Sequence, residues 1–178
     1  MCSQDDFGYI KQLFHGSVVR IDVYDISLFL NDLPVDFGNG FYTTPKLEEA
    51  LAWGRRKNPY EIVLNEYDLD IDAIKKLSVK VFKTTDFEWF NFVLKCRKNN
   101  LRPKEYDLII GPVAAYPDYE LMQQYDSGDI DKKDVEQELK LSPDRFTQVV
   151  FCTEVSKAAL TLLSAEHVKL KGNNNERG

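Results

Sequence analysis

The stretch Asp36-Phe37-Gly38-Asn39-Gly40-Phe41-Tyr42-Thr43-Thr44 decides most of what the sequence predicts about the fold. Its two glycines indicate a tight turn, because glycine adopts backbone conformations that other residues avoid. The apolar and β-branched residues after the turn predict a short strand. Tyr42 leaves the turn in this strand, where its ring can lie against a flat heteroaromatic ligand or in the core. For this stretch alone, a hairpin turn followed by a core aromatic is the plainer interpretation.

A second short motif, Phe14-His15-Gly16-Ser17, ends an extended run near the N-terminus. Gly16 lets a ligand approach the backbone closely, and its N–H and C=O can hold an amide group. His15 beside it can hydrogen-bond a sugar hydroxyl. A lone histidine at the end of a strand is more often structural, so this motif by itself predicts no function.

Strand and helix patterns follow one another irregularly along the chain. Strand patterns cover residues 9–15, 18–24, 61–67, 77–82, 106–111, 146–152 and 166–170. Helical patterns cover a segment that opens at Pro45 and residues 86–98, 117–126, 131–140 and 155–162, with Asp86 and Asp131 as N-caps. Because no regular βαβ alternation is present, we expect an α+β fold.

Length and composition indicate one globular domain. The chain has 178 residues, of which 43% are hydrophobic, enough to bury a core. We expect a single domain over residues 1–170 and a disordered polar tail over residues 171–178. No apolar run is long enough to span a membrane, and the acidic N-terminus does not resemble a signal peptide. The three widely spaced cysteines, Cys2, Cys96 and Cys152, indicate reduced thiols and a cytoplasmic protein without a metal site.

The formal net charge of -6 disfavours unspecific binding to a phosphate backbone. Two local basic runs, Arg55-Arg56-Lys57 and residues 95–104, are candidates for a nucleic-acid contact. A solvated, charged helix face is the simpler interpretation of both runs.

Together, the motifs resemble a known superfamily. His-Gly-Ser followed by Phe-Gly-x-Gly-x-Tyr is similar to the first two motifs of the diphtheria-toxin-like ADP-ribosyltransferases, which include the poly(ADP-ribose) polymerases. The whole series resembles more closely a bacterial family of uncharacterised proteins assigned to that superfamily. The later matching segments are Trp89-Phe90-Asn91-Phe92-Val93, the strand from Tyr106 to Ala114, and Gln148-Val149-Val150-Phe151. The resemblance covers roughly residues 13–163.

This resemblance implies a split β core of two small antiparallel sheets with flanking helices, and NAD bound between the sheets as a substrate. It implies that His15 bonds the adenine-side ribose, that the Gly16 backbone holds the nicotinamide carboxamide, and that Tyr42 stacks on the nicotinamide ring. The cofactor-binding residues expected on this basis are His15, Gly16, Ser17, Gly40, Phe41, Tyr42 and Thr43. The catalytic residues expected are His15, Tyr42 and Gln148.

At Gln148, the chain departs from the superfamily. Transferases of this superfamily usually carry a glutamate on this late strand, whose charge stabilises the oxocarbenium-like centre formed when the nicotinamide–ribose bond breaks. Glutamine can accept a hydrogen bond from the ribose hydroxyl but carries no charge. A nearby carboxylate could replace the missing one, and the acidic candidates in the motif regions are Asp36, Asp107, Asp118 and Glu154.

Two functions from different classes therefore remain open. The first is an NAD-dependent mono-ADP-ribosyltransferase that modifies a protein or a nucleic acid. By analogy with small bacterial transferases it could be the toxin of a toxin–antitoxin or phage-defence module, with an antitoxin as partner. The second is an NAD- or ADP-ribose-binding module with little or no turnover, which Gln148 favours. In a third interpretation the chain is an interaction protein, and the glycines and Tyr42 serve folding alone.

Overall fold

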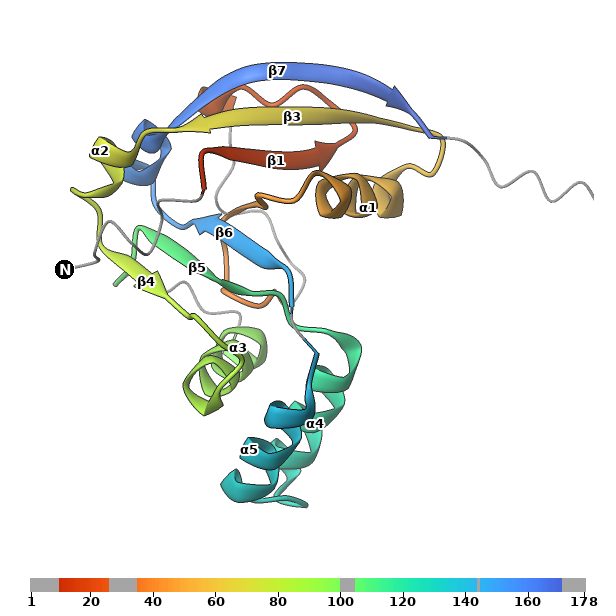
Figure 1. Cartoon of the computed structure of the whole chain (residues 1–178), viewed down its shortest axis with the longest axis vertical. Helices are drawn as coiled ribbons and strands as arrows, with labels where there is room; N and C mark the ends of the chain where they lie inside the picture. Colours follow the sequence, from red (N-terminus) through yellow and green to blue (C-terminus); the bar gives the residue numbers. More distant parts are fainter. Residues whose placement is uncertain (1–9, 26–34, 100–104, 144, 171–178) are drawn as a thin grey trace, which may run out of the picture.

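The protein is described by a computed structural model that covers residues 10–25, 35–99, 105–143 and 145–170. It has the α+β fold predicted from the sequence, built around two small sheets (Figure 1). The predicted tail at 171–178 lies outside the described residues. Across the described part of the chain, no helix combines the length and apolar character needed to cross a membrane.

The first sheet has three antiparallel strands in the order β1-β3-β7. They are β1 (Gln12–Ser17), β3 (Glu61–Leu69) and β7 (Leu160–Lys169). Helix α1 (Leu47–Lys57) packs against β1 and β3, on the side of this sheet that faces the second sheet (Figure 1).

The second sheet has four strands in the order β2-β6-β5-β4. They are β2 (Phe41–Thr43), β6 (Thr147–Phe151), β5 (Leu108–Pro112) and β4 (Val79–Val81). β4 and β5 are parallel, which corrects the expectation of two purely antiparallel sheets. The reason is the connection between them, because α3 (Phe87–Asn99) forms a crossover that returns the chain in the same direction.

Three further helices and two short 3₁₀ segments complete the described fold. The helices are α2 (Ile71–Ile74), α4 (Tyr116–Ser127) and α5 (Lys132–Leu141). The 3₁₀ segments are η2 (Val23–Asp25) and η3 (Val155–Ala159). Asp86 and Asp131 cap α3 and α5 as predicted, since each side chain accepts hydrogen bonds from backbone N–H groups of the first turn.

Two predicted elements are wrong. Residues 18–24, predicted as a strand, form bends and the 3₁₀ segment η2, because side chains of β3 bind their backbone. The Asn65 Oδ1 atom accepts a hydrogen bond from the Ile21 N–H, and the Tyr67 hydroxyl donates to the Ile21 carbonyl. Residues 155–162, predicted as a helix, contain η3 and the start of β7, where Leu160 pairs with Leu69. The last strand is therefore longer than the predicted 166–170, and its pairing with β3 overrides the local pattern.

Two apolar clusters fill the structure, and the central strands contribute to both. Leu108, Ile110 and Phe151 belong to the cluster between the two sheets. Ile109 and Val150 face the opposite side and belong to a second cluster with the helices. The predicted core residues Trp89, Phe90 and Val93 are completely buried in the second cluster. Because both faces of the second sheet are covered, β6 and β5 form a rigid frame that carries Gln148 at the edge of the core.

Candidate functional site

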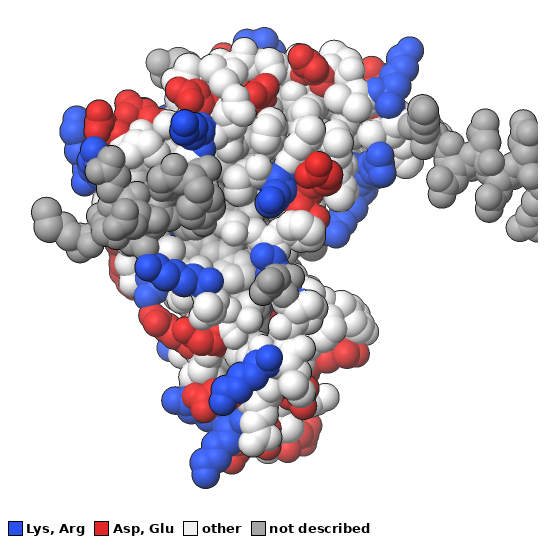
Figure 2. Space-filling model, in the orientation of Figure 1, with Lys and Arg blue, Asp and Glu red and all other residues white. Residues whose placement is uncertain are grey.

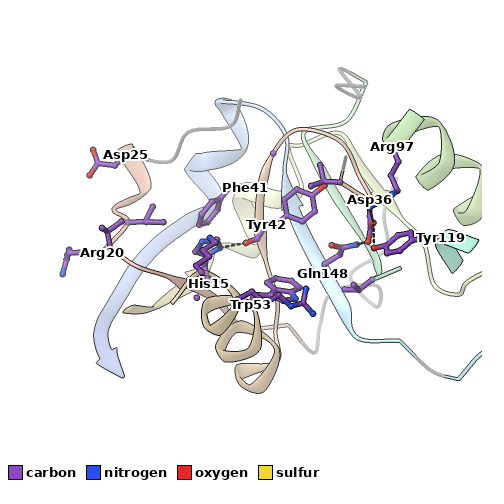
Figure 3. Close-up of a pocket in the computed structure, with 18 residues that line it drawn as sticks. His15, Arg20, Asp25, Asp36, Phe41, Tyr42, Trp53, Arg97, Tyr119 and Gln148 are labelled. Carbon is purple, nitrogen blue, oxygen red and sulfur yellow. Dashed lines mark hydrogen bonds and ion pairs between the residues drawn. The ribbon is translucent and has the colours of Figure 1, made fainter. Parts of the chain in front are cut away.

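One cleft of about 620 Å³ gathers most of the residues that the sequence singled out. It lies between the first sheet with α1 and the second sheet with its helices, and Figure 3 shows its labelled side chains. His15, Phe41, Tyr42 and Trp53 lie in its middle, and Asp36, Gln148, Arg97 and Tyr119 lie together at one end (Figure 3). Gly16 and Gly40 also line it. The cleft therefore joins the two glycine motifs to the late strand β6.

His15 is held in one tautomer at the centre of the cleft. Its Nδ1 atom lies 2.7 Å from the backbone carbonyl oxygen of Tyr42. A carbonyl only accepts hydrogen bonds, so Nδ1 carries the proton and Nε2 of the neutral ring keeps its lone pair. Burial, and to a smaller extent the positive charge of Lys57, lowers the pKa of His15 to about 4. His15 is therefore a neutral hydrogen-bond acceptor at physiological pH, not a cation.

The backbone of Gly16 presents one edge of β1 to the cleft. The Phe14 N–H and C=O pair with Thr44, on the side of β1 away from β3. The directions of backbone groups alternate along a strand, and the β1–β3 register is regular, so the N–H and C=O of Gly16 also point away from β3. Gly16 therefore offers one donor and one acceptor side by side at the edge of β1, an arrangement that matches a primary amide.

Gly16 and Gly40 are also required by packing. A Cβ atom on Gly16 would lie 1.9 Å from the Ala50 carbonyl oxygen in α1. A Cβ atom on Gly40 would lie 2.8 Å from the Phe151 carbonyl oxygen in β6. Both distances are shorter than any real contact, so these glycines let α1 and β6 approach the two motifs. Packing therefore requires both glycines, and both also line the cleft.

The ring of Tyr42 is fixed in position by its own turn. Its hydroxyl donates a hydrogen bond to the Gly38 carbonyl oxygen at 2.7 Å and accepts one from the Phe37 N–H at 3.0 Å. Gly38 has a φ of 75°, so the glycine predicted at this turn is needed for its backbone. Burial raises the pKa of Tyr42 well above its usual value, so the side chain stays a neutral phenol. The ring of Tyr42 is therefore an uncharged aromatic surface, fixed in position, in the lining of the cleft.

Gln148 lies at the inner end of the cleft, beside a buried carboxylate. Its Nε2 atom donates to Asp36 Oδ2 at 3.2 Å and to the Pro112 carbonyl oxygen at 3.3 Å. Gln148 and Asp36 are 2% and 6% exposed, so the contact is shielded from water. Of the acidic candidates predicted from the sequence, Asp36 alone lies in the described lining of the cleft. The others make structural contacts: Asp107 with Thr153, Asp118 with Arg145, and Glu154 with Lys157.

Sequence reasoning named three of the four cationic side chains in the described lining of the cleft only as parts of basic runs and did not place them in a site. Arg56 and Lys57 line it from the last turn of α1, and Arg20 and Arg97 line it from other elements. The sequence showed Arg55-Arg56-Lys57 as a basic run but gave no sign that α1 ends at the cleft. Trp53, one turn earlier in α1, lines the same space and was also missed. An aromatic residue followed by a basic pair on one helix is the signal that could have found them.

Ser17 and Thr43, which the sequence placed among the ligand-binding residues, lie outside the described lining of the cleft. Both are buried. The Ser17 hydroxyl accepts a hydrogen bond from the Val19 N–H, and the Thr43 hydroxyl donates to the Val149 carbonyl oxygen in β6. Their side chains connect elements of the fold around the cleft.

The ionisation of the described side chains limits the chemistry available in the site. Burial raises the pKa of the Cys96 and Cys152 thiols to about 12, so neither is a thiolate nucleophile at neutral pH. Within the described residues, no group of three or more His, Cys, Asp or Glu side chains is placed to hold a metal ion. The cleft offers the neutral acceptor of His15, a backbone donor and acceptor at Gly16, aromatic rings and cationic side chains. These features suit a ligand with a carboxamide, flat rings, hydroxyls and negative charge.

Comparison with known proteins identifies a family without an assigned activity. The sequence profile of the family described as "Protein of unknown function (DUF3990)" matches residues 11–162. No curated protein and no solved structure matches the chain.

Proposed function

The chain belongs to the DUF3990 family, and from the cleft we propose that it is an NAD-dependent mono-ADP-ribosyltransferase acting on a macromolecule. The observation that carries the proposal is the convergence of three groups in one cleft of about 620 Å³. These are the open backbone edge of Gly16, the fixed ring of Tyr42 and the neutral ring of His15. Each corresponds to a different part of NAD.

The nicotinamide end of NAD fits the middle of the cleft. Its carboxamide has one donor and one acceptor side, which complement the C=O and N–H of Gly16. Its flat ring can lie against Tyr42, whose orientation is fixed by two hydrogen bonds to the turn. Because both elements are already in place, little conformational entropy is lost when nicotinamide binds.

The rest of the dinucleotide fits the polar groups that line the cleft. Nε2 of His15 can accept a hydrogen bond from a hydroxyl of the adenine-side ribose, since Nδ1 holds the proton. Arg56 and Lys57 line the same space and can pair with the pyrophosphate. These cations explain how a chain with a formal net charge of -6 can attract an anionic dinucleotide.

The transfer reaction breaks the bond between the nicotinamide nitrogen and ribose C1′. The bonding electron pair moves to the positively charged nicotinamide, which leaves neutral, and C1′ develops oxocarbenium character. A nucleophilic atom of the acceptor then forms the new bond to C1′ and releases its proton to solvent. Gln148, at the inner end of the cleft, is the residue we assign to the 2′-hydroxyl of this ribose, as an uncharged acceptor.

A binding module for NAD or ADP-ribose is the second candidate. The presence of Gln148 favours this second candidate, because the amide of a glutamine stabilises a positive centre less than the carboxylate of a glutamate does. The two candidates share the cleft and differ in turnover alone.

Incubation of the purified protein with labelled NAD and cell extract tests both candidates. We expect release of nicotinamide and a labelled macromolecule, and we expect His15→Ala to lower both by at least tenfold. His167→Ala is the matched control, because His167 is an exposed histidine on β7 that contacts Glu61. Calorimetric binding of NAD without nicotinamide release would support the binding module. Absence of both binding and release at millimolar NAD would contradict the whole proposal.

A further inference from the structure

At the inner end of the cleft, the Asp36 side chain binds residues from four other parts of the fold. Its Oδ1 atom lies 3.0 Å from Arg97 Nη1 on α3 and 3.2 Å from the Tyr119 hydroxyl on α4. Its Oδ2 atom accepts hydrogen bonds from the Ala114 N–H at 2.9 Å and from Gln148 Nε2 at 3.2 Å. Figure 3 shows Asp36 between Arg97, Tyr119 and Gln148. Because each of these four contacts supplies a hydrogen-bond donor, the two oxygens of Asp36 have little capacity left to accept hydrogen bonds from a ligand.

These contacts fix the direction of the Gln148 amide. Both partners of its nitrogen, Asp36 Oδ2 and the Pro112 carbonyl oxygen, are acceptors. Only the NH₂ end of an amide can face two acceptors, so Oε1 must occupy the opposite end. Among the described residues Oε1 receives no hydrogen bond, and Gln148 lines the cleft. An acceptor oxygen is therefore left for a ligand.

From this geometry we propose that Asp36 is a positioning residue for the transfer reaction, and the proposal rests on the function proposed above. Asp36 holds Gln148 with Oε1 toward the 2′-hydroxyl of the reacting ribose. Its charge also polarises the amide, since a hydrogen bond donated to a carboxylate increases the electron density on the amide oxygen. Asp36 and Gln148 thus act as a pair where a single glutamate acts in the related transferases. Although Asp36 lines the cleft, its oxygens are occupied by donors of the protein, so it acts on the ribose through Gln148.

An exchange of partners tests this pairing. Gln148→Glu alone places two carboxylates where Nε2 and Oδ2 are now 3.2 Å apart, next to a third acceptor at Pro112. Asp36→Asn alone offers an NH₂ group toward Gln148, which allows the Gln148 amide to turn Oε1 away from the ribose. The double variant Asp36→Asn/Gln148→Glu allows an amide NH₂ at position 36 to face a carboxylate at position 148 and keeps the total charge unchanged, so it restores the contact with position 36 but not the one with the Pro112 carbonyl oxygen.

Steady-state nicotinamide release, with kcat and KM for NAD determined separately, is the measurement. We expect Asp36→Asn to lower kcat at least tenfold and to change KM less than threefold, because NAD contacts Asp36 only through Gln148. We expect the double variant to recover at least tenfold in kcat over either single variant. A purely structural role for Asp36 predicts instead that Tm and the fraction of folded protein fall together, while kcat per folded protein stays within twofold of the wild type.

Asp118→Asn is the matched control. Asp118 is also a buried carboxylate, 2% exposed, that binds a backbone N–H and an arginine, Arg145. It lies outside the described lining of the cleft. We expect Asp118→Asn to lower the Tm and to leave kcat of the folded protein within twofold.

If Asp36→Asn does not fold, the glutamine side-chain NMR signals of the wild-type protein test the same geometry. The Gln148 signal is the one that Gln148→Met removes. We expect its NH₂ protons to exchange slowly with water and its shift to change when NAD is added.

The possible failures are distinguishable. A wild-type protein that neither binds NAD nor releases nicotinamide overturns the proposed function, and this inference with it. An active wild type overturns this inference alone if Asp36→Asn keeps its kcat, if the double variant is no better than the single variants, or if the Gln148 NH₂ exchanges freely.

Discussion

At the scale of single residues, one hydrogen bond decides what His15 can do. Because its Nδ1 atom faces the Tyr42 carbonyl at 2.7 Å, the ring has a free acceptor and no free donor when neutral. The cation is disfavoured by burial and by Lys57, which lowers the pKa of the ring to about 4. The structure therefore leaves Nε2 of His15 as a hydrogen-bond acceptor in a fixed position.

This low pKa predicts a loss of stability in acid. The folded pKa is about 4 and the ordinary value is 6.5, so the unfolded chain takes up the proton first as the pH falls. Stability from the neutral ring is complete above pH 6.5 and is lost between pH 6.5 and pH 4, amounting to about 2 kcal/mol at pH 5. Urea unfolding of the wild type at pH 7 and pH 5 measures the loss.

Carboxylates also titrate in this range, so the difference between two proteins isolates His15. In His15→Asn the loss between pH 7 and pH 5 should be smaller by about 2 kcal/mol, whereas His167→Asn should behave as the wild type. An equal loss in the wild type and in His15→Asn would show that His15 titrates normally in the folded protein.

The sequence predicted some residues of the cleft lining well, but not the contact between Asp36 and Gln148. His15, Gly16, Tyr42 and Gln148 line the cleft as expected, because each belongs to a motif with a local chemical meaning. The hydrogen bond from Gln148 to Asp36 joins residues 112 positions apart. No local pattern encodes such a contact, so the sequence offered Asp36 as one of four acidic candidates and could not rank it.

At the scale of elements, the packing of α1 on β1 forms one wall of the cleft. Gly16 on β1 faces Ala50 and Gly54 on α1 with no space for a side chain. This close approach brings the last turn of α1, with Arg56 and Lys57, to the cleft. Because Gly16 and Gly54 allow this close packing, α1 contributes positive charge to the cleft.

Substitution of Gly16 tests this packing. Gly16→Ala should destabilise the protein by about 3 kcal/mol, because its Cβ would lie 1.9 Å from the Ala50 carbonyl oxygen and the backbone of α1 must move. Gly128→Ala is the control: its Cβ meets nothing within 4 Å, and its φ of 83° alone should cost about 1 kcal/mol. Thermal unfolding of both variants gives the comparison, and equal losses would contradict the packing described for Gly16.

The elements that the sequence mispredicted share one physical cause. Residues 18–24 and 155–162 have patterns compatible with a strand and a helix, but β3 decides both. Its side chains Asn65 and Tyr67 bind the backbone of the first segment, and its backbone pairs with Leu160 in the second. The helices with caps at Asp86 and Asp131 were predictable because their signals are local.

At the scale of the whole molecule, the charge of the cleft differs in sign from the net charge of the chain. The charged side chains seen on one face in Figure 2 alternate in sign without a continuous basic surface. Among the described residues, the cleft is lined by four cationic side chains and two carboxylates, while the chain carries a formal net charge of -6. The described lining of the cleft thus has a local excess of positive charge in an acidic chain, which favours a small anionic ligand over a nucleic-acid backbone.

The central claim is that NAD occupies this cleft in one orientation. Electron density from crystals grown with NAD tests it most directly, because it shows each part of the ligand against its residues. We predict the nicotinamide ring against Tyr42 with its carboxamide on the Gly16 backbone, a ribose hydroxyl at His15 Nε2, and the pyrophosphate at Arg56 and Lys57. Density for NAD outside the cleft, or an empty cleft at millimolar NAD, would contradict the account.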